Sequence, residues 1–145
     1  MMAKRKRKTV AIAESCTGGL VSDRITDVPG SSEYFLGGVI TYSNKAKETI
    51  LGVPAGLIKK HGAVSREVAR VMAEGARGVF ESDIAASITG IAGPGGATKA
   101  KPVGLAYIAF ASRKGTNTKK VVYKGSRREV KEKFANAVIR GLSSL

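Results

Sequence analysis

A carboxylate, a hydroxyl, a thiol and a second hydroxyl follow one another in the segment Glu14–Thr17, and two glycines come directly after it. An apolar run over 9–13 leads into this segment, and an amphipathic run over 20–25 leads away from it. The pattern predicts a strand, a sharp turn and the start of a helix, where free backbone N–H groups can stabilise a developing negative charge. We therefore expect a nucleophile at this turn, with the Ser15 hydroxyl as the candidate.

The segment 41–47 is the best candidate for supplying a base to Ser15. It reads Thr-Tyr-Ser-Asn-Lys-Ala-Lys and leads from a second predicted strand into a helix, so its polar groups can share a sheet edge with Ser15. A desolvated lysine near other cations can lose its proton near neutral pH and activate a hydroxyl, while Tyr42 could relay or donate a proton. The structural alternative is that Ser43 or Asn44 caps the helix and the lysines are solvated.

Three further residues have competing interpretations. Cys16 is the rival nucleophile because a thiol at a helix start has a lowered pKa, although a single cysteine is also a common packing residue. Glu14 is costly at a buried strand end unless it is paired, so it either bonds loop amides or a lysine in the site, or ties down the 15–19 turn structurally. His61 stands in a Lys-Lys-His-Gly sequence that fits a helix end better than a general base.

The glycine-rich segment 90–96 follows a predicted buried strand over 83–89. Its small residues and N–H groups suit close approach to a phosphate, a ribose or an amide oxygen, whereas the alternative is a tight loop without a ligand. Ligands of open α/β sheets bind beyond the carboxyl ends of the strands, so this segment and 15–19 face one cleft if they share an edge. The standard phosphate-loop, dinucleotide and nucleophile-elbow patterns are not matched, and no Cys/His cluster predicts a metal site.

The composition predicts one domain of ordinary size. The chain has 145 residues, of which 43% are hydrophobic, and no apolar run approaches the ~20 residues that a membrane span needs. We expect no membrane partner and no signal peptide, because the apolar segment after the first basic residues is too short and too polar. The single cysteine fits a reducing compartment, so a cytoplasmic location is expected.

The net charge of +14 is high for a domain of this size. Five charges lie in the block Lys4–Lys8, and we interpret residues 1–8 as a solvated basic tail. A second basic group over 113–133 is interpreted as a solvated face. Such charge permits nucleic-acid binding, but the chain has only four Tyr and four Phe and no binding motif, so nucleic acid is not expected as a partner.

The periodicity of apolar residues predicts a single α/β domain over 9–145. Strands are expected at 9–14, 34–41, 83–89, 103–111 and 119–124, and helices at 17–27, 43–51, 54–60, 66–79 and 127–143. The last two strands are expected to pair as a hairpin around 115–117. These elements predict a three-layer α/β/α sandwich with a mixed, mainly parallel sheet.

Several motifs in this order resemble the CinA C-terminal domain family. They lie at 13–19 (Ala-Glu-Ser-Cys-Thr-Gly-Gly), 28–32 (Val-Pro-Gly-Ser-Ser), 35–44, 51–53, 61–65, 89–96 (Thr-Gly-Ile-Ala-Gly-Pro-Gly-Gly) and 101–104. The resemblance covers about residues 9–143, and the number of ordered motifs makes it far more specific than any single glycine pattern.

The resemblance implies a nicotinamide-nucleotide amidase, which converts nicotinamide mononucleotide to nicotinic acid mononucleotide and ammonia in pyridine nucleotide recycling. It also implies an α/β/α sandwich that forms a homo-oligomer and needs neither a metal nor an organic cofactor. By the same resemblance Ser15 is the nucleophile, and Tyr42 and Lys47 assist proton transfer. The residues expected to contact the substrate are Glu14, Cys16, Thr17, Gly18, Gly19, Ser31, Thr89, Gly90 and Gly93.

Two other functions remain open at this point. The same fold could serve as a nucleotide-binding or regulatory module without turnover, against which the presence of Ser15, Tyr42 and Lys47 argues. A basic nucleic-acid-binding protein is the less favoured alternative, for the reasons given above.

Overall fold

Five strands form one mixed sheet in the computed structural model, which describes residues 7–145. The strands are β1 (Val10–Glu14), β2 (Phe35–Ile40), β3 (Ile84–Gly90), β4 (Leu105–Ser112) and β5 (Gly115–Val122). Their order across the sheet is β2-β1-β3-β4-β5; β1 is parallel to β2 and β3, while β4 is antiparallel to β3 and β5. Four strands therefore run in one direction, which confirms the predicted mixed, mainly parallel sheet.

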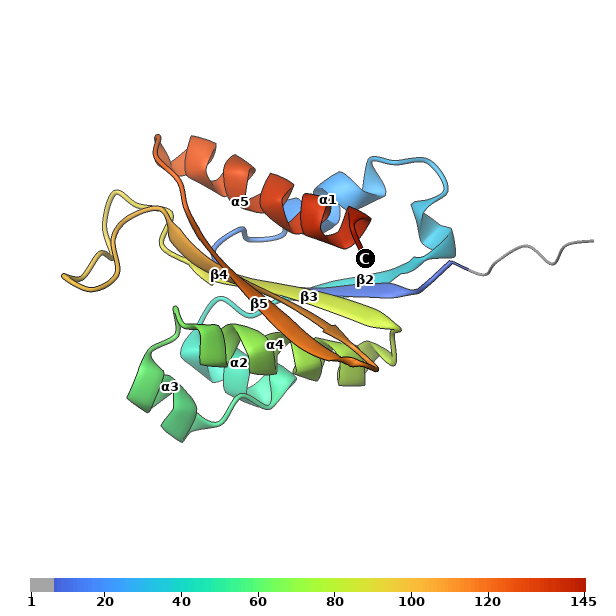
Figure 1. Cartoon of the computed structure of the whole chain (residues 1–145), viewed down its shortest axis with the longest axis horizontal. Helices are drawn as coiled ribbons and strands as arrows, with labels where there is room; N and C mark the ends of the chain where they lie inside the picture. The colour runs from blue at the N-terminus through green and yellow to red at the C-terminus, as the bar shows by residue number, and fades with distance from the viewer. Residues whose placement is uncertain (1–6) are drawn as a thin grey trace, which may run out of the picture.

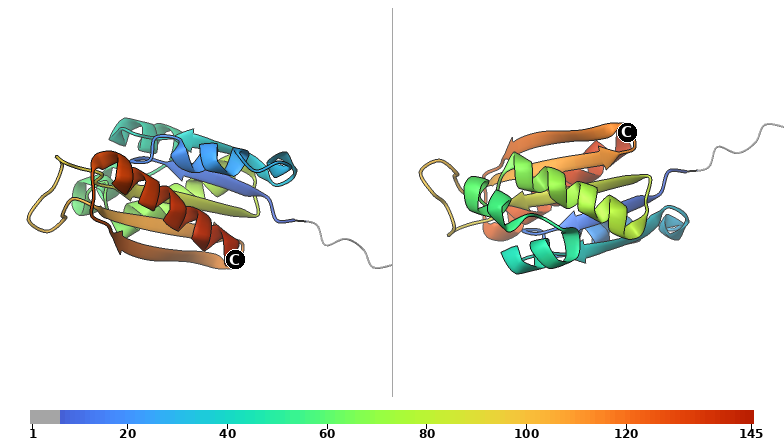
Figure 2. Two further views of the ribbon diagram at one scale, coloured as in Figure 1. Left: turned by 90° about the horizontal axis from the view of Figure 1, so that it is seen from above. Right: turned by 90° about the horizontal axis from the view of Figure 1, so that it is seen from below.

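Helices cover both faces of this sheet. They are α1 (Leu20–Thr26), α2 (Asn44–Leu51), α3 (Ala55–His61), α4 (Arg66–Phe80) and α5 (Arg127–Ser143), and a short 3₁₀ helix spans Ser31–Glu33. Figure 1 shows α1 and α5 on one face and α2, α3 and α4 on the other, and the two views in Figure 2 show each helical layer from its own side. The three-layer α/β/α sandwich predicted from the sequence is confirmed.

The central strands are buried on both faces, and their side chains pack alternately into two hydrophobic cores, one on each side of the sheet. Ile12 of β1 packs with Phe134 of α5 in the core on one side of the sheet, while Ala11 and Ala13 pack with Met72 of α4 on the other. Because successive side chains of a strand point to opposite faces, a short strand of small and branched apolar residues serves both layers at once.

Two boundaries differ from the sequence prediction, each for a local reason. Helix α1 begins at Leu20 rather than at 17, because Gly18 and Gly19 take positive φ values of 59° and 106° and delay the first helical turn. The β4–β5 connection lies at 113–114 rather than at 115–117. There the Ser112 hydroxyl accepts from the Lys114 N–H at 3.2 Å and Ser112 pairs with Gly115.

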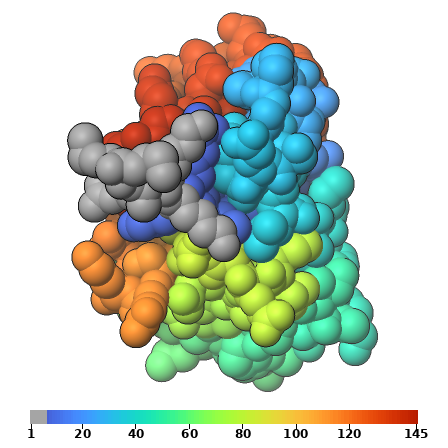
Figure 3. Space-filling view, turned by 90° about the vertical axis from the view of Figure 1, so that its right-hand side faces the viewer, coloured from blue at the N-terminus to red at the C-terminus, as the bar shows by residue number. Residues whose placement is uncertain are grey.

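The basic segment 1–8 lies partly outside the described residues, which begin at Arg7. Within the described part, the Arg7 guanidinium lies 5.4 Å from the centre of the Tyr34 ring, a cation–π distance. Figure 3 shows the edge of the molecule where the chain enters β1, with the segment before β2, the end of α4 and the β4–β5 hairpin around it. None of the helices within 7–145 combines the length and the apolar character needed to cross a bilayer.

Helix α4 approaches α2 closely at Gly75, and this contact gives a stability prediction. A Cβ at Gly75 would lie 2.2 Å from the Leu51 carbonyl oxygen, whereas a Cβ at Gly78 of the same helix would meet nothing within 4 Å. We expect Gly75→Ala to lower the free energy of unfolding by about 1–3 kcal/mol through this clash. Gly78→Ala should raise it by about 0.5–1 kcal/mol, because alanine is the better helix former.

Urea unfolding of the two variants against the parent chain provides the measurement. Equal and positive effects of both alanines would contradict the close α2–α4 contact, which fixes the position of α2 over the sheet.

Candidate active site

The predicted site segments meet at one edge of the sheet. Glu14, the last residue of β1, pairs with Ile40 of β2 and with Ile88 of β3, and the Ser15 N–H donates to the Ile88 carbonyl at 3.1 Å. The turn after β1, the segment after β2 and the loop after β3 therefore lie side by side, at the same end of the molecule as the start of α5 (Figure 1). The ends of β1 and β3 thus share an edge, which is the condition under which the sequence placed the 15–19 and 90–96 segments at one cleft.

A buried serine–lysine contact forms the centre of this edge. The Lys47 Nζ lies 3.0 Å from the Ser15 Oγ, and the two side chains are 1% and 8% exposed. Helix α2 delivers Lys47 to this position because Ser43 caps its start, accepting the Ala46 N–H at 3.1 Å. The sequence offered the Ser43 cap and the lysine–serine contact as alternatives, and the structure shows both. Of the two lysines in the segment, Lys45 is solvent-exposed and Lys47 is buried.

The surroundings of Lys47 favour the neutral amine. Burial lowers its pKa below the ordinary value of 10.5. Its other contacts are two neutral carbonyls, those of Thr41 at 2.7 Å and Tyr42 at 3.2 Å. Within residues 7–145 no carboxylate lies within ion-pair distance of this amine. An amine that donates two protons to carbonyls keeps a lone pair for the Ser15 hydroxyl, which is the arrangement a general base requires.

Glu14 is a structural carboxylate that shapes the turn. It is fully buried, and its two oxygens accept five hydrogen bonds. The donors are the Thr17 hydroxyl at 2.6 Å, the Ser22 hydroxyl at 2.7 Å and the N–H groups of Gly19, Val21 and Ser22 at 2.9–3.1 Å. The carboxylate thus occupies the N–H groups at the start of α1, and of the two interpretations of Glu14 the geometry favours the structural one.

Cys16 does not have the activated thiol that its position suggested. Burial raises its pKa to about 12, against smaller opposing effects of its own backbone and of Lys47. The expected lowering at a helix start fails because α1 begins only at Leu20 and its N–H groups are taken by Glu14. At neutral pH the residue is a protonated, 8% exposed packing side chain.

The Tyr42 phenol, which was expected to assist proton transfer, contacts Arg127 rather than Lys47. Its side chain is 62% exposed, and its phenol oxygen accepts from the Arg127 guanidinium at 3.3 Å. Arg127 also donates to the Gly93 carbonyl at 2.7 Å. Only the backbone carbonyl of Tyr42, rather than its phenol, contacts Lys47 among the interactions of the described residues. Arg127 is the residue that sequence analysis missed, because it was one cation among the 25 Lys and Arg of the chain.

The end of β3 and the loop that follows it are closely packed. Thr89 is buried and donates its hydroxyl to the Ala63 carbonyl at 2.9 Å. A Cβ at Gly90 would lie 2.6 Å from the Ala106 Cβ, and one at Gly93 would lie 2.4 Å from a Val103 methyl. The close contacts at Gly90 and Gly93 therefore fix the course of the loop. The Thr89 hydroxyl is engaged by the Ala63 carbonyl.

Ser31 is the one predicted site residue that the structure separates from the others. It lies in the 3₁₀ helix before β2, and the Tyr34 carbonyl that follows accepts from Val10 at the start of β1. Because β1 and β2 are parallel, the residues before β2 lie at the opposite edge from Ser15. Ser31 does not join the Ser15 cluster within one chain.

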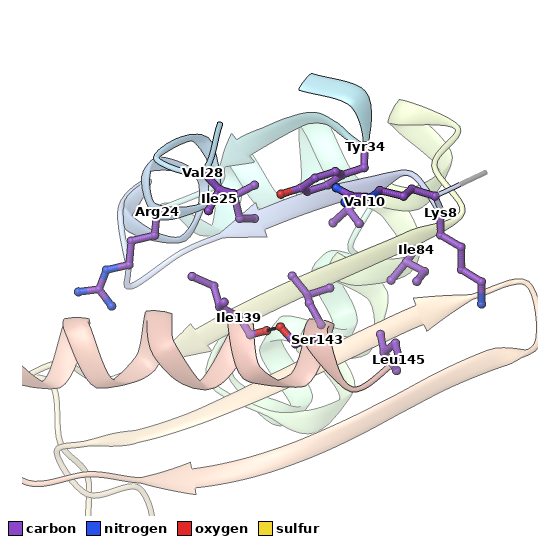
Figure 4. A pocket seen from close by; sticks show the side chains of 12 residues that line it. Lys8, Val10, Arg24, Ile25, Val28, Tyr34, Ile84, Ile139, Ser143 and Leu145 are labelled. Atoms are coloured by element: carbon purple, nitrogen blue, oxygen red, sulfur yellow. Dashed lines mark hydrogen bonds between the residues drawn. The ribbon is translucent and has the colours of Figure 1, made fainter. Parts of the chain in front are cut away.

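That opposite edge holds a hollow of about 940 Å³. Figure 4 shows its apolar side chains, with Ile25 and Val28 near α1 and Ile139 on α5, and with Lys8 and Arg24 at its sides. The hollow is lined at the starts of β1 and β3, so it is a feature separate from the serine–lysine site. Within 7–145 no group of three or more His, Cys, Asp or Glu could hold a metal ion.

The fold and site define an α/β/α domain with a buried serine–lysine pair at the carboxyl edge of its sheet. The family model of the CinA C-terminal domain matches residues 1–145. A CinA-like protein from Geobacter sulfurreducens is 55% identical over 124 residues, which are 86% of this chain and 30% of that protein. The chain belongs to the CinA C-terminal domain family, whose named relatives include competence/damage-inducible proteins.

Solved structures agree with this assignment. The competence/damage inducible protein CihA from Agrobacterium tumefaciens superposes with a TM-score of 0.92 at 38% identity, covering 94% of this chain and 84% of that one. The competence damage-inducible protein A (ComA) from Klebsiella pneumoniae gives 0.91 at 31% identity, with 94% and 85% covered. The chain spans about a third of the length of the curated relatives that it matches.

The five bonds to Glu14 predict that its charge is needed for stability. In Glu14→Gln one oxygen becomes an NH₂ group that faces N–H and O–H donors, so we expect the free energy of unfolding to fall by about 2–4 kcal/mol. Glu33→Gln, at an exposed glutamate, is the matched control and should change stability by less than about 0.5 kcal/mol. Thermal and urea unfolding would measure both; equal stability of the two variants would contradict the role given to Glu14.

Proposed function

We propose that this chain is an amidase that hydrolyses the carboxamide of nicotinamide mononucleotide to nicotinic acid mononucleotide and ammonia. The observation that carries the proposal is the 3.0 Å contact between the buried Lys47 amine and the Ser15 hydroxyl. A hydroxyl beside a neutral amine is an activated nucleophile for acyl transfer. The choice of a pyridine nucleotide among amides is supported by the resemblance to the family. The same resemblance supports the proposal that the chain forms a homo-oligomer.

The reaction begins with proton transfer from Ser15 to Lys47. The two N–H groups of the neutral amine remain hydrogen-bonded to the carbonyls of Thr41 and Tyr42, so its lone pair accepts the hydroxyl proton. The Ser15 oxygen then forms a bond to the carboxamide carbon, and the carbonyl π electrons move to the carboxamide oxygen. The products of this step are a tetrahedral oxyanion and a protonated Lys47 that remains bonded to both backbone carbonyls.

The oxyanion would be held by N–H groups that the fold leaves available. The Gly18 N–H donates to the Ser15 carbonyl, and the Gly19 N–H donates to Glu14. Cys16 and Thr17 make no backbone N–H bond to another residue among the interactions of the described residues. We assign the oxyanion to these two N–H groups, because the residue after a nucleophile is a common donor to it.

Collapse of the oxyanion expels the nitrogen. The C–N bond breaks, Lys47 returns its proton to the leaving group, and ammonia departs from an ester on Ser15. A water molecule then loses a proton to Lys47 and adds its oxygen to the ester carbon. Breaking of the ester bond returns that proton to Ser15 and releases the carboxylic acid. Arg127 holds Tyr42 and the 90–96 loop around this centre through its bonds to the phenol and to Gly93.

Ammonia release from nicotinamide mononucleotide by the purified protein is the direct test. We expect Ser15→Ala to lower kcat by at least about 10⁴-fold, since it removes the nucleophile. Cys16→Ala should retain activity within a few-fold, because the thiol is protonated at neutral pH. Activity lost only in the cysteine variant would overturn the assignment of Ser15. Nucleotide binding without turnover in the parent chain would favour a regulatory module.

The lowered pKa of Lys47 predicts the pH dependence. Only the neutral amine accepts the Ser15 proton, so kcat/KM should rise with pH along an acid limb whose apparent pKa lies below 10.5. Lys47→Met should lower kcat/KM by about 10²–10⁴-fold and remove that limb. Lys45→Met, at an exposed lysine of the same helix, is the control and should leave the profile unchanged. An unaltered limb in Lys47→Met would exclude this lysine as the base.

A further inference from the structure

Two cations of α5 lie close to segments of the serine–lysine site. Arg127 and Lys131 are four positions apart and so lie on the same face of the helix. Arg127 reaches the Gly93 carbonyl and the Tyr42 phenol, on one side of the site. Lys131 lies near the turn that carries Ser15: its Nζ would be 3.9 Å from a Cβ at Gly18, and its charge acts to lower the pKa of Cys16.

The positive charges of this pair are not neutralised by protein carboxylates. Arg127 donates to two uncharged oxygens, and neither cation forms an ion pair within the described part of the chain. The acidic residues of the same helix segment are engaged elsewhere: Glu129 bonds the Ser126 cap and Glu132 pairs with Arg128. Glu14, which directly precedes Ser15 in the chain, already accepts five hydrogen bonds.

Arg127 and Lys131 therefore lie beside the site segments without a carboxylate partner among residues 7–145. The N-terminal end of α5 adds a partial positive charge, although its first-turn N–H at Glu129 is already capped by Ser126. An anion that enters beside Ser15 would meet a guanidinium, an ammonium and this helix end together. Cations arranged in this way recognise a phosphate monoester, with the arginine as a fork and the lysine as a point charge.

We propose that Arg127 and Lys131 form the anion site that binds the phosphate monoester of the substrate. This inference rests on the proposed amidase function and deepens it, since it makes the phosphate a requirement for tight binding. The phosphate end is held by α5 while the amide end reaches Ser15. Lys131 is the cleaner residue to test, because Arg127 also holds Tyr42 and Gly93.

The test compares nicotinamide mononucleotide with nicotinamide riboside, which carries the same amide without the phosphate. For the parent chain and for Lys131→Gln, ammonia release gives kcat and KM for each. We expect Lys131→Gln to raise KM for the mononucleotide about tenfold or more and to leave kcat and the riboside constants unchanged. Lys133→Gln removes the same charge from the same helix, bonds the Lys124 carbonyl instead, and should behave as the parent.

The parent KM for the mononucleotide should also rise with salt, and less so in Lys131→Gln. An unchanged KM for the mononucleotide in Lys131→Gln, or an equal loss with both substrates, would overturn the anion site while leaving the amidase intact.

Calorimetric titration with ribose 5-phosphate separates this inference from the proposed function. Binding by the parent that weakens about tenfold in Lys131→Gln, and does not change in Lys133→Gln, supports the anion site even if no ammonia is released. Absence of ribose 5-phosphate binding by the parent, together with equal turnover of mononucleotide and riboside, overturns it.

Discussion

The structure depends on the burial of one amine without a counter-ion. Lys47 is 1% exposed, and an isolated ammonium in such a place would be costly. The fold avoids that cost by lowering the pKa of Lys47 and by offering it two backbone carbonyls and a hydroxyl. Both carbonyls come from the residues that follow β2. The Lys47 amine therefore ties the segment between β2 and α2 to the Ser15 turn through hydrogen bonds.

A second polar group, Glu14, makes the opposite use of burial. Its charge is stabilised by five donors from the turn and from α1, so the turn after β1 is held in one shape. The same bonds occupy the helix N–H groups that would otherwise attract an anion. The N–H groups of Cys16 and Thr17, rather than those of the helix, are therefore the ones available to the oxyanion of the proposed reaction.

The sequence predicts the elements well because apolar periodicity follows directly from the two-sided burial of the sheet. It leaves open whether the 15–19 and 90–96 segments share an edge, because the direction and order of the strands come from the sheet itself. The Ser15–Lys47 contact needed the family resemblance, since the residues alone could not distinguish Lys45 from Lys47. Of the two interpretations of Cys16 the structure favours the packing residue; the pattern shows a helix start but neither the burial of the thiol nor the Glu14 bonds. The separation of Ser31 from Ser15, and the contacts of Arg127 with Tyr42 and Gly93, follow from the tertiary structure, which no local spacing in the sequence encodes.

The cations of α5 bear on the charge state of Lys47 in the proposed complex. A phosphate dianion near a neutral amine favours its protonated form, which would remove the base when the substrate binds. In that complex Arg127 and Lys131 oppose this effect, because they place two positive charges against the phosphate. The proposed complex thus brings the negative charge of the phosphate to two positive charges, so that phosphate binding works against the loss of the neutral base at the amide.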